Sequence, residues 1–432
     1  MSKITRRDFL KIAGATSAAG VLGHIPLAYA AKHGMSKGSA RVVIVGGGFG
    51  GATCAKYLRR LDPGIAVTLV EPSSKFITCP FSNLVLGGLR TMDSITHSFD
   101  ALKKKHGVNV IHDTVTSIDA AGNKVKLKSG KTLAYDRLVV SPGIDFKYDA
   151  IQGYSAKAEE VMPHAWKAGP QTVLLQKKLK AMKNGGTFVI VAPPNPFRCP
   201  PGPYERASIV AHYFKEQKPK SKILILDAKD KFSKQGLFEA GWQKLYPGMI
   251  EWIPGNKGGT VKSVDVKKMI LDAEMAKHKA DVVNLIPAQT AGKIALTSGL
   301  ADDKGWCPVD PVTFESKKHP GIHVIGDSSI AGALPKSGFA ATSEAKMCAA
   351  AIVAMLKGET PAANSFSNTC YSFVGPKYGI SVAGVYNNTE KGITSIEGSG
   401  GVSPKDAPDS FREEEAKYAF GWYESIAADS WG

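Results

Sequence analysis

Short runs of apolar and β-branched residues recur along the chain, separated by glycine turns and by stretches with helical composition. The first run, at 41–45, is Arg-Val-Val-Ile-Val, and a second run at 66–70 follows a helix-like stretch at 52–61. Continuous apolar runs of this length are typical of strands buried in a parallel sheet. The pattern therefore predicts a strand–helix–strand unit of an α/β fold.

A glycine turn joins the first strand to the helix of this unit. Gly46, Gly48 and Gly51 fit the dinucleotide-binding fingerprint, in which glycines allow a tight turn, close approach to a pyrophosphate, and helix–strand packing. Unpaired N–H groups at the helix N-terminus favour a bound phosphate. Glu71 follows the turn by about twenty residues, which is the spacing of the carboxylate that binds a ribose. These features together predict a dinucleotide site.

A second α/β unit is predicted further along the chain, with strands at 185–191, 222–227 and 280–287. The turn after the first of these strands, at 192–203, is rich in proline rather than glycine. Proline lacks the N–H group that binds a phosphate and cannot adopt the dihedral angles of glycine. The sequence therefore predicts a second Rossmann-like unit that binds no NAD(P).

The chain then returns to the first unit with a strand that ends in Gly326 and Asp327. A Gly-Asp pair in this place matches the second FAD signature, in which the aspartate binds the ribityl chain. Lys336 and Gly338 open an alanine-rich helix that extends to about Leu356. The N-terminus of this helix would face the flavin and stabilise negative charge on the reduced ring. The two signatures together predict FAD as the cofactor.

After residue 358 the composition shifts toward Ser, Asn, Tyr and Gly, which indicates a third segment with a sheet and a last helix opening near Arg412. The expected fold is α/β, with two Rossmann-like domains of the glutathione-reductase type and a C-terminal α+β domain. The expected divisions are a signal peptide at 1–30, an FAD-binding domain at 40–150 and 288–360, a second Rossmann-like domain at 151–287, and a C-terminal domain at 361–432.

The composition is that of a globular protein with a basic surface. Of 432 residues, 43% are hydrophobic and 22% are charged, and the formal net charge is +17. The basic residues are spread along the chain without a run interleaved with aromatic residues. This distribution argues against a nucleic-acid partner and favours an acidic protein partner or an anionic substrate.

The first thirty residues are typical of an export signal. Thr5–Lys11 contains twin arginines, a weakly apolar stretch follows at 12–22, and Ala28–Ala30 forms an A-x-A cleavage site. This pattern predicts export to the bacterial periplasm, which is an oxidising compartment. No other stretch is expected to span a membrane.

The chain has six cysteines. Cys54 and Cys348 lie in predicted helices and are expected to be core residues. The other four are expected in loops or at the ends of elements, where a structural disulfide is the simplest role in the periplasm. They are Cys79, Cys199, Cys307 and Cys370. Cys199 lies in the proline-rich turn beside the flavin and Cys370 follows the flavin-capping helix, so a redox disulfide is the alternative. Pairing with Cys307 remains open.

Several sequence strings resemble the flavoprotein subunit family of flavocytochrome c sulfide dehydrogenase, which is related to sulfide:quinone oxidoreductases. The resemblance extends from Arg41 to Gly432. The strings are GGGxGGAT (46–53), TCxxSN (78–83), PHAWKAG (163–169), FRCPPGPYERAS (197–208), GWCPVD (305–310), HVIGD (323–327), PKSG (335–338) and NTCYS (368–372).

This resemblance assigns expected roles to individual residues. It implies that Cys79 attaches FAD through a thioether to the 8α-methyl carbon. It also implies that Cys199 and Cys370 form a redox-active disulfide. Glu205 is similar to the acid near the flavin in this family and is a candidate for handling protons. Candidate aromatic residues near the flavin are Trp422 and Phe339.

The function implied by the resemblance is that of a periplasmic, FAD-dependent sulfide dehydrogenase. Hydrosulfide would attack the disulfide, giving a persulfide on one cysteine and a thiolate on the other, and two electrons would pass to FAD. Because the chain has no C-x-x-C-H motif, the haem that receives these electrons is expected on a c-type cytochrome partner. No residue is assigned to a metal. The alternatives are a sulfide:quinone oxidoreductase and a non-enzymatic, flavin-stabilised redox-sensing module.

Overall fold

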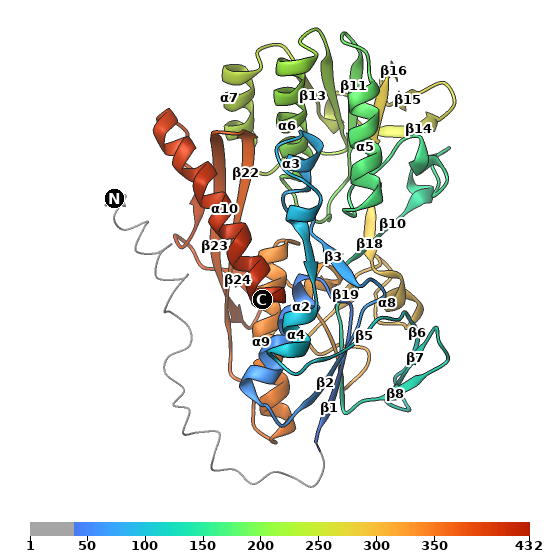
Figure 1. Ribbon diagram of the computed structural model, residues 1–432, viewed down its shortest axis with the longest axis vertical. Coiled ribbons are helices and arrows are strands. Elements are labelled where there is room, and N and C mark those ends of the chain that lie inside the picture. The colour runs from blue at the N-terminus through green and yellow to red at the C-terminus, as the bar shows by residue number, and fades with distance from the viewer. Residues whose placement is uncertain (1–38) are drawn as a thin grey trace. The chain divides into compact units, whose positions relative to one another are not determined.

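The computed structural model describes residues 39–432, so the predicted signal peptide at 1–30 lies outside the described residues. Within the described part, the chain forms two parallel sheets and a C-terminal antiparallel sheet, together with several smaller sheets and the helices that accompany them (Figure 1). The expected α/β fold, with two Rossmann-like units and a C-terminal α+β unit, is confirmed. The residue boundaries expected for the domains remain predictions.

The first parallel sheet has the strand order β20-β9-β1-β2-β5. Its strands are β1 (Arg41–Val45), β2 (Ala66–Val70), β5 (Asn109–Ile111), β9 (Arg137–Val140) and β20 (Ile322–Val324). The accompanying helices are α2 (Phe49–Leu61), α4 (Asp100–Lys104) and α9 (Gly338–Leu356). Strands β1 and β2 begin and end where the apolar runs predicted. Helix α2 begins three residues earlier than expected, because the last glycines of the turn already form its first helical turn.

Several short strands, helices and turns lie outside the two parallel sheets. They are β3 (Lys75–Ile77) with β4 (Thr96–Ser98), α3 (Ser82–Leu86), β6 (Val115–Asp119) with β7 (Lys124–Leu127) and β8 (Thr132–Ala134), β10 (Ile144–Phe146) with β18 (Gln289–Ala291), α8 (Lys293–Thr297), and β19 (Cys307–Pro308) with β21 (Ser329–Ile330). Single 3-10 turns are η2 (Asp93–Ile95), η3 (Tyr148–Ala150), η4 (Ala158–Glu160), η5 (Gly255–Lys257) and η6 (Gly326–Ser328).

The second parallel sheet has the order β13-β12-β11-β17. Its strands are β11 (Thr187–Ala192), β12 (Lys222–Asp227), β13 (Ile250–Ile253) and β17 (Val282–Leu285). Its helices are α5 (Pro170–Ala181), α6 (Gly202–Gln217) and α7 (Gln235–Leu245), and an antiparallel sheet of β14 (Val261–Asp265), β15 (Ile270–Ala273) and β16 (Lys277–Lys279) follows β13. The proline-rich turn lies between β11 and α6, as the sequence predicted.

The C-terminal sheet is built on the long hairpin of β22 (Ser365–Gly375) and β23 (Tyr378–Thr389), with β24 (Gly392–Ser395) and β25 (Gly401–Val402) beside β23. Helix α10 (Asp409–Trp431) runs alongside this sheet (Figure 1). The expectation that Cys370 lies in a loop or at the end of an element is wrong. Cys370 lies in the middle of β22, paired with Val382, because the hairpin turns only after Gly375.

Helix α9 is long and apolar enough to cross a membrane, although the sequence analysis expected no such stretch outside the signal. However, 56% of its most apolar window is buried inside the fold, where α9 packs against α2 and β22. An apolar helix that is covered by other elements in this way is explained as a core helix.

Gly51 lies at a position where the fold has no room for a side chain. A Cβ atom added there would lie 1.9 Å from the carbonyl oxygen of Gly46, which itself has φ +98°. Since this contact joins α2 to the turn after β1, Gly51→Ala should displace the helix and destabilise the protein by about 3 kcal/mol. Urea unfolding of the purified protein measures this loss.

Gly421 provides the matched control, because it is also a helical glycine, in α10, but an added Cβ would meet no atom within 4 Å. Gly421→Ala should leave stability unchanged or raise it by about 0.5–1 kcal/mol through the better helix propensity of alanine. Equal unfolding midpoints for the two variants would contradict the packing role of Gly51.

Candidate functional site

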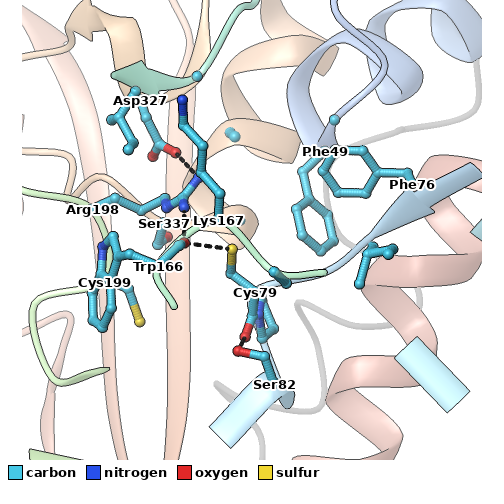
Figure 2. Close-up of a pocket in the computed structure, with 18 of the residues that line it drawn as sticks. Phe49, Phe76, Cys79, Ser82, Trp166, Lys167, Arg198, Cys199, Asp327 and Ser337 are labelled. Atoms are coloured by element: carbon cyan, nitrogen blue, oxygen red, sulfur yellow. Dashed lines mark hydrogen bonds and ion pairs between the residues drawn. The ribbon is translucent and has the colours of Figure 1, made fainter. Parts of the chain in front are cut away.

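One pocket of about 480 Å³ collects residues from both parallel sheets and from the C-terminal sheet. It lies at the carboxyl ends of β1 and β2, which is where open α/β sheets bind ligands. Most of the residues predicted for the site line it, namely Gly46, Gly48, Glu71, Cys79, Cys199, Glu205, Gly326, Asp327, Gly338 and Cys370. Gly51 and Lys336 are not among the lining residues. Figure 2 shows part of this pocket, with Cys79 and Cys199 in the same view.

The glycine turn and Glu71 form one wall. The backbone N–H of Gly47 donates to Glu71 Oε2 at 2.8 Å, and the N–H of Ser73 donates to Oε1 at 3.0 Å. A Cβ at Gly47 would lie 2.7 Å from the ring of Phe99, so no side chain fits between the turn and the acid. The carboxylate is therefore held beside the turn, in the position of a group that binds a ribose.

Four polar side-chain atoms on the pocket wall are buried and have no hydrogen-bond partner. They are Trp166 Nε1, Arg198 Nε, Asp327 Oδ1 and Trp422 Nε1. A buried polar atom without a partner costs about 1–3 kcal/mol, so such atoms are rare unless a ligand satisfies them. Together with the glycine turn, this set of donors and an acceptor fits a large polar ligand such as FAD.

Asp327 lies next to the guanidinium of Arg198, with Oδ2 3.8 Å from Arg198 Nη1 (Figure 2). Burial raises the pKa of Asp327, and the charges of Arg198 and Lys336 oppose this shift. Lys336, which does not line the pocket, contacts the loop that carries Asp327. Its ammonium donates to the carbonyl oxygens of Asp327 and Ser329, both at 2.8 Å, so it fixes the loop that carries Asp327.

Glu344 of α9 also contacts the loop that carries Asp327. Its Oε2 accepts the N–H of Gly326 at 2.7 Å and lies 3.3 Å from the hydroxyl of Ser329. Burial raises the pKa of Glu344 to about 8, although the hydrogen bond from Gly326 and the charge of Lys336 favour the ionised form.

The described cysteines are all free thiols. Of the four cysteines that were expected in loops or at element ends, Cys79, Cys199 and Cys370 line the pocket, whereas Cys307 is buried away from it. Cys199 has a left-handed backbone, with φ 58°, and its N–H donates to the carbonyl of Lys336 at 2.8 Å. Burial raises the pKa of the Cys199 thiol, and the negative charges of a Cys370 thiolate and of Glu205 raise it further.

Glu205 connects the elements around these cysteines. Its Oε1 accepts the N–H of Phe373 in β22 at 2.9 Å, and its Oε2 accepts the side-chain amide of Asn83 at 2.7 Å. The Oδ1 atom of Asn83 accepts from Arg206 Nε at 2.9 Å. Burial raises the pKa of Glu205, against these two hydrogen bonds and the charges of Lys234 and Arg206.

The structure adds residues that the sequence analysis gave no role. Trp166 and Arg198 lie in the strings PHAWKAG and FRCPPGPYERAS, so their strings were a signal that they belong to the site. Asn83 likewise ends the string TCxxSN. Lys234 carried no sequence signal. Of the two candidate aromatic residues, Trp422 lines the pocket and Phe339 does not.

No group of three or more potential metal ligands is found within residues 39–432.

Comparisons with known proteins agree with this geometry. The family model of the central part of the sulfide dehydrogenase [flavocytochrome c] flavoprotein chain matches residues 172–287, and that of the flavocytochrome c sulphide dehydrogenase flavin-binding region matches residues 362–431. The pyridine nucleotide-disulphide oxidoreductase model matches residues 40–180. The model of the twin-arginine translocation signal matches residues 3–23, so the chain carries a signal for export to the periplasm.

Individual proteins give the same picture. The chain is 73% identical over 48 residues to the sulfide dehydrogenase [flavocytochrome c] flavoprotein chain of Chlorobaculum thiosulfatiphilum, covering 11% of this chain and 100% of that sequence. It is 25% identical over 324 residues to the mitochondrial sulfide:quinone oxidoreductase of Mus musculus, covering 68% of this chain and 66% of that enzyme.

The fold is similar to that of the sulfide:quinone oxidoreductase structure from Aquifex aeolicus, with a TM-score of 0.71, 18% identity, and coverage of 91% of this chain and 92% of that one. The flavin-binding family model and the pocket agree on a flavin as the cofactor, and FAD is the form that the pocket fits. The chain belongs to the flavoprotein chain family of flavocytochrome c sulfide dehydrogenase, a family of oxidoreductases.

Proposed function

We propose that this protein oxidises hydrogen sulfide to sulfur or polysulfide through Cys199 and Cys370, holds FAD covalently on Cys79, and passes electrons to a haem on a c-type cytochrome subunit. The observation that supports this most directly is that these three cysteines come from separate parts of the chain and line one pocket with the glycine turn and Asp327.

The sulfur step is an exchange between a hydrosulfide anion and a Cys199–Cys370 disulfide. One new S–S bond forms between the incoming sulfur and one cysteine, the bond between the two cysteines breaks, and the other cysteine leaves as a thiolate with the electron pair. When bound, FAD would supply a two-electron acceptor for this step that can be reoxidised in single-electron steps.

The residues around the sulfurs bind, orient and handle protons. Glu205 lies between Asn83 and the backbone of Phe373, and burial raises its pKa, which suits a carboxyl group that takes up and releases a proton during the exchange. Arg198 and Asp327 provide the buried polar atoms, left without protein partners, that would bind the flavin and its ribityl chain.

The position of Cys79 supports the proposed covalent attachment. It lines the pocket, and its Sγ lies 3.1 Å from the carbonyl oxygen of Trp166, across from Ser82, whose hydroxyl donates to the Cys79 carbonyl (Figure 2). Forming a thioether would release the thiol proton and leave the two electrons of the lost methyl C–H bond on the flavin ring. A covalent bond would keep FAD in the protein during single-electron turnover.

A second candidate is a sulfide:quinone oxidoreductase, which the similarity to the Mus musculus and Aquifex aeolicus enzymes favours. The two candidates share the sulfur step and differ in the electron acceptor. Reoxidation of the sulfide-reduced flavin by a c-type cytochrome, but not by a soluble quinone analogue, is the result that separates them.

Removing either sulfur of the pair should stop the reaction. We expect Cys199→Ser and Cys370→Ser each to lower the rate of sulfide-dependent bleaching of the flavin spectrum by about a thousandfold or more, because neither variant can form the disulfide. Cys307→Ser is the control, because Cys307 is buried outside the pocket, and it should bleach like the unchanged protein. Bleaching of all three variants at the unchanged rate would exclude the disulfide mechanism.

The role of Cys79 can be tested by colour. After denaturation in acid, the yellow colour should stay with the polypeptide of the unchanged protein and of Cys199→Ser, since the thioether survives unfolding. In Cys79→Ser the flavin should appear in the supernatant. If the unchanged protein also releases its flavin, the covalent attachment is refuted while the sulfur step remains open to test.

A further inference from the structure

Lys234 is a buried cation at the back of the cysteine pocket. It lies just before α7, and its side chain extends to the C-terminal sheet, with only 7% of the residue exposed. The ammonium donates to the hydroxyl of Ser372 at 2.8 Å, to the carbonyl of Cys370 at 3.4 Å, and to the carbonyl of Ile380 at 3.5 Å. All three acceptors are neutral, and no carboxylate among the described residues lies within ion-pair distance of it.

Three features make this arrangement costly. A buried ammonium without an anionic partner costs several kcal/mol. The backbone of Lys234 has φ 60° and ψ 27°, a left-handed conformation that is unfavourable for a residue with a side chain. The residue also occupies the N-cap of α7, where the helix dipole disfavours a positive charge. Strain and unpaired charge that meet at a pocket point to a function for the charge.

The groups that face this cation identify what it acts on. Burial lowers the pKa of Lys234, and the negative charges that oppose this shift are, in order, those of a Cys370 thiolate, Glu205, a Cys199 thiolate and Glu415. Around Cys370, burial raises the pKa of the thiol, the charge of Lys234 lowers it, and the charge of Glu205 raises it. Arg198 acts instead on Cys199, whose pKa it lowers. Lys234 is therefore the cation whose charge lowers the pKa of Cys370, while Cys199 also has the charge of Arg198 near it.

We infer that Lys234 is the fixed counter-charge for the anionic sulfur that residue 370 carries when the Cys199–Cys370 bridge is open. The inference rests on the proposed function for the opening of the bridge, but the ionisation of Cys370 is a property of this chain alone. Hydrosulfide brings one negative charge into a buried pocket, and Lys234 holds an unpaired positive charge there already. The charge that enters with the substrate is thus neutralised without the transfer of a proton from outside.

The experiment measures the ionisation of Cys370 in the FAD-containing protein. In a Cys199→Ser background, residue 370 is the remaining thiol of the pair, and its alkylation by iodoacetamide is followed against pH by mass spectrometry of its peptide. Since the thiolate is the reactive form, the rate reports the pKa. Lys234→Met and Lys234→Gln should raise the midpoint by about one pH unit or more, which is a tenfold slower alkylation below the midpoint. Lys234→Arg should keep the alkylation midpoint of Cys370 at its value in the Cys199→Ser protein.

Lys218 gives a matched control. It is also buried, at 8% exposure, and its ammonium donates to the backbone carbonyls of Leu179, Lys180 and Met182, away from the pocket. Lys218→Met should leave the alkylation midpoint of Cys370 unchanged. An equal shift in this variant would show that loss of any buried lysine loosens the fold, and would overturn the inference. An unchanged midpoint in both neutral variants of Lys234 would overturn it as well.

Sulfide-dependent bleaching in the chain with Cys199 intact separates this inference from the proposed function. If sulfide bleaches the flavin and the Lys234 variants do not change the alkylation midpoint, the proposed function stands and the counter-charge is refuted. If sulfide does not bleach the flavin but the midpoint shifts, the sulfide reaction is refuted and the role of Lys234 in ionising Cys370 stands. If sulfide bleaches the flavin and the alkylation midpoint shifts, both proposals stand. The bleaching rate of Lys234→Gln should then fall by about the same factor as the alkylation rate of Cys370 in that variant.

Discussion

The carboxyl group of Glu205 joins the three walls of the pocket. One oxygen accepts the N–H of Phe373 in the C-terminal sheet, the other accepts the amide of Asn83 in the first unit, and the residue itself belongs to α6 of the second unit. Because Asn83 also accepts from Arg206, its amide cannot rotate without losing both bonds. Each pocket cysteine lies within a few residues of one of these anchors, so the network sets where the three sulfurs stand.

Charge in this pocket is unbalanced in a way that suits an anion. The cations that line it are Lys75, Lys167, Arg198 and Arg206, with Lys234 buried behind Cys370, and the acids that line it are Glu71, Glu205 and Asp327. Burial raises the pKa of Glu205 and Asp327, and it lowers the pKa of Arg206 and Lys234. Since an isolated ion is costly in a medium of low polarity, anionic ligands such as a diphosphate or hydrosulfide lower the free energy of the site on entry.

The sequence predicted the first unit well because its requirements are local. The strands at 41–45 and 66–70, the glycine turn and the helix that ends at Leu356 follow from short apolar runs and from residues with special backbone freedom. It was wrong about Cys370, because the length of the hairpin that contains it is set by packing against α9 and α10 rather than by local composition. Lys234 could not be found at all, since only the folded chain brings a residue of the second unit against Ser372.

The proline-rich turn illustrates how one local change can alter what a Rossmann-like unit does. Its prolines offer no N–H groups to a phosphate, and the N–H of Cys199 is already used, because it donates to the carbonyl of Lys336 in the first unit. The turn is thereby fastened to the loop that carries Asp327, and the thiol faces the pocket that fits the flavin. A sulfur held in this way is resident, whereas a nicotinamide must bind and leave. In the proposed reaction the substrate is hydrosulfide, which offers few contacts for recognition, and reaction with a resident sulfur would replace a binding site that so small a molecule could not fill.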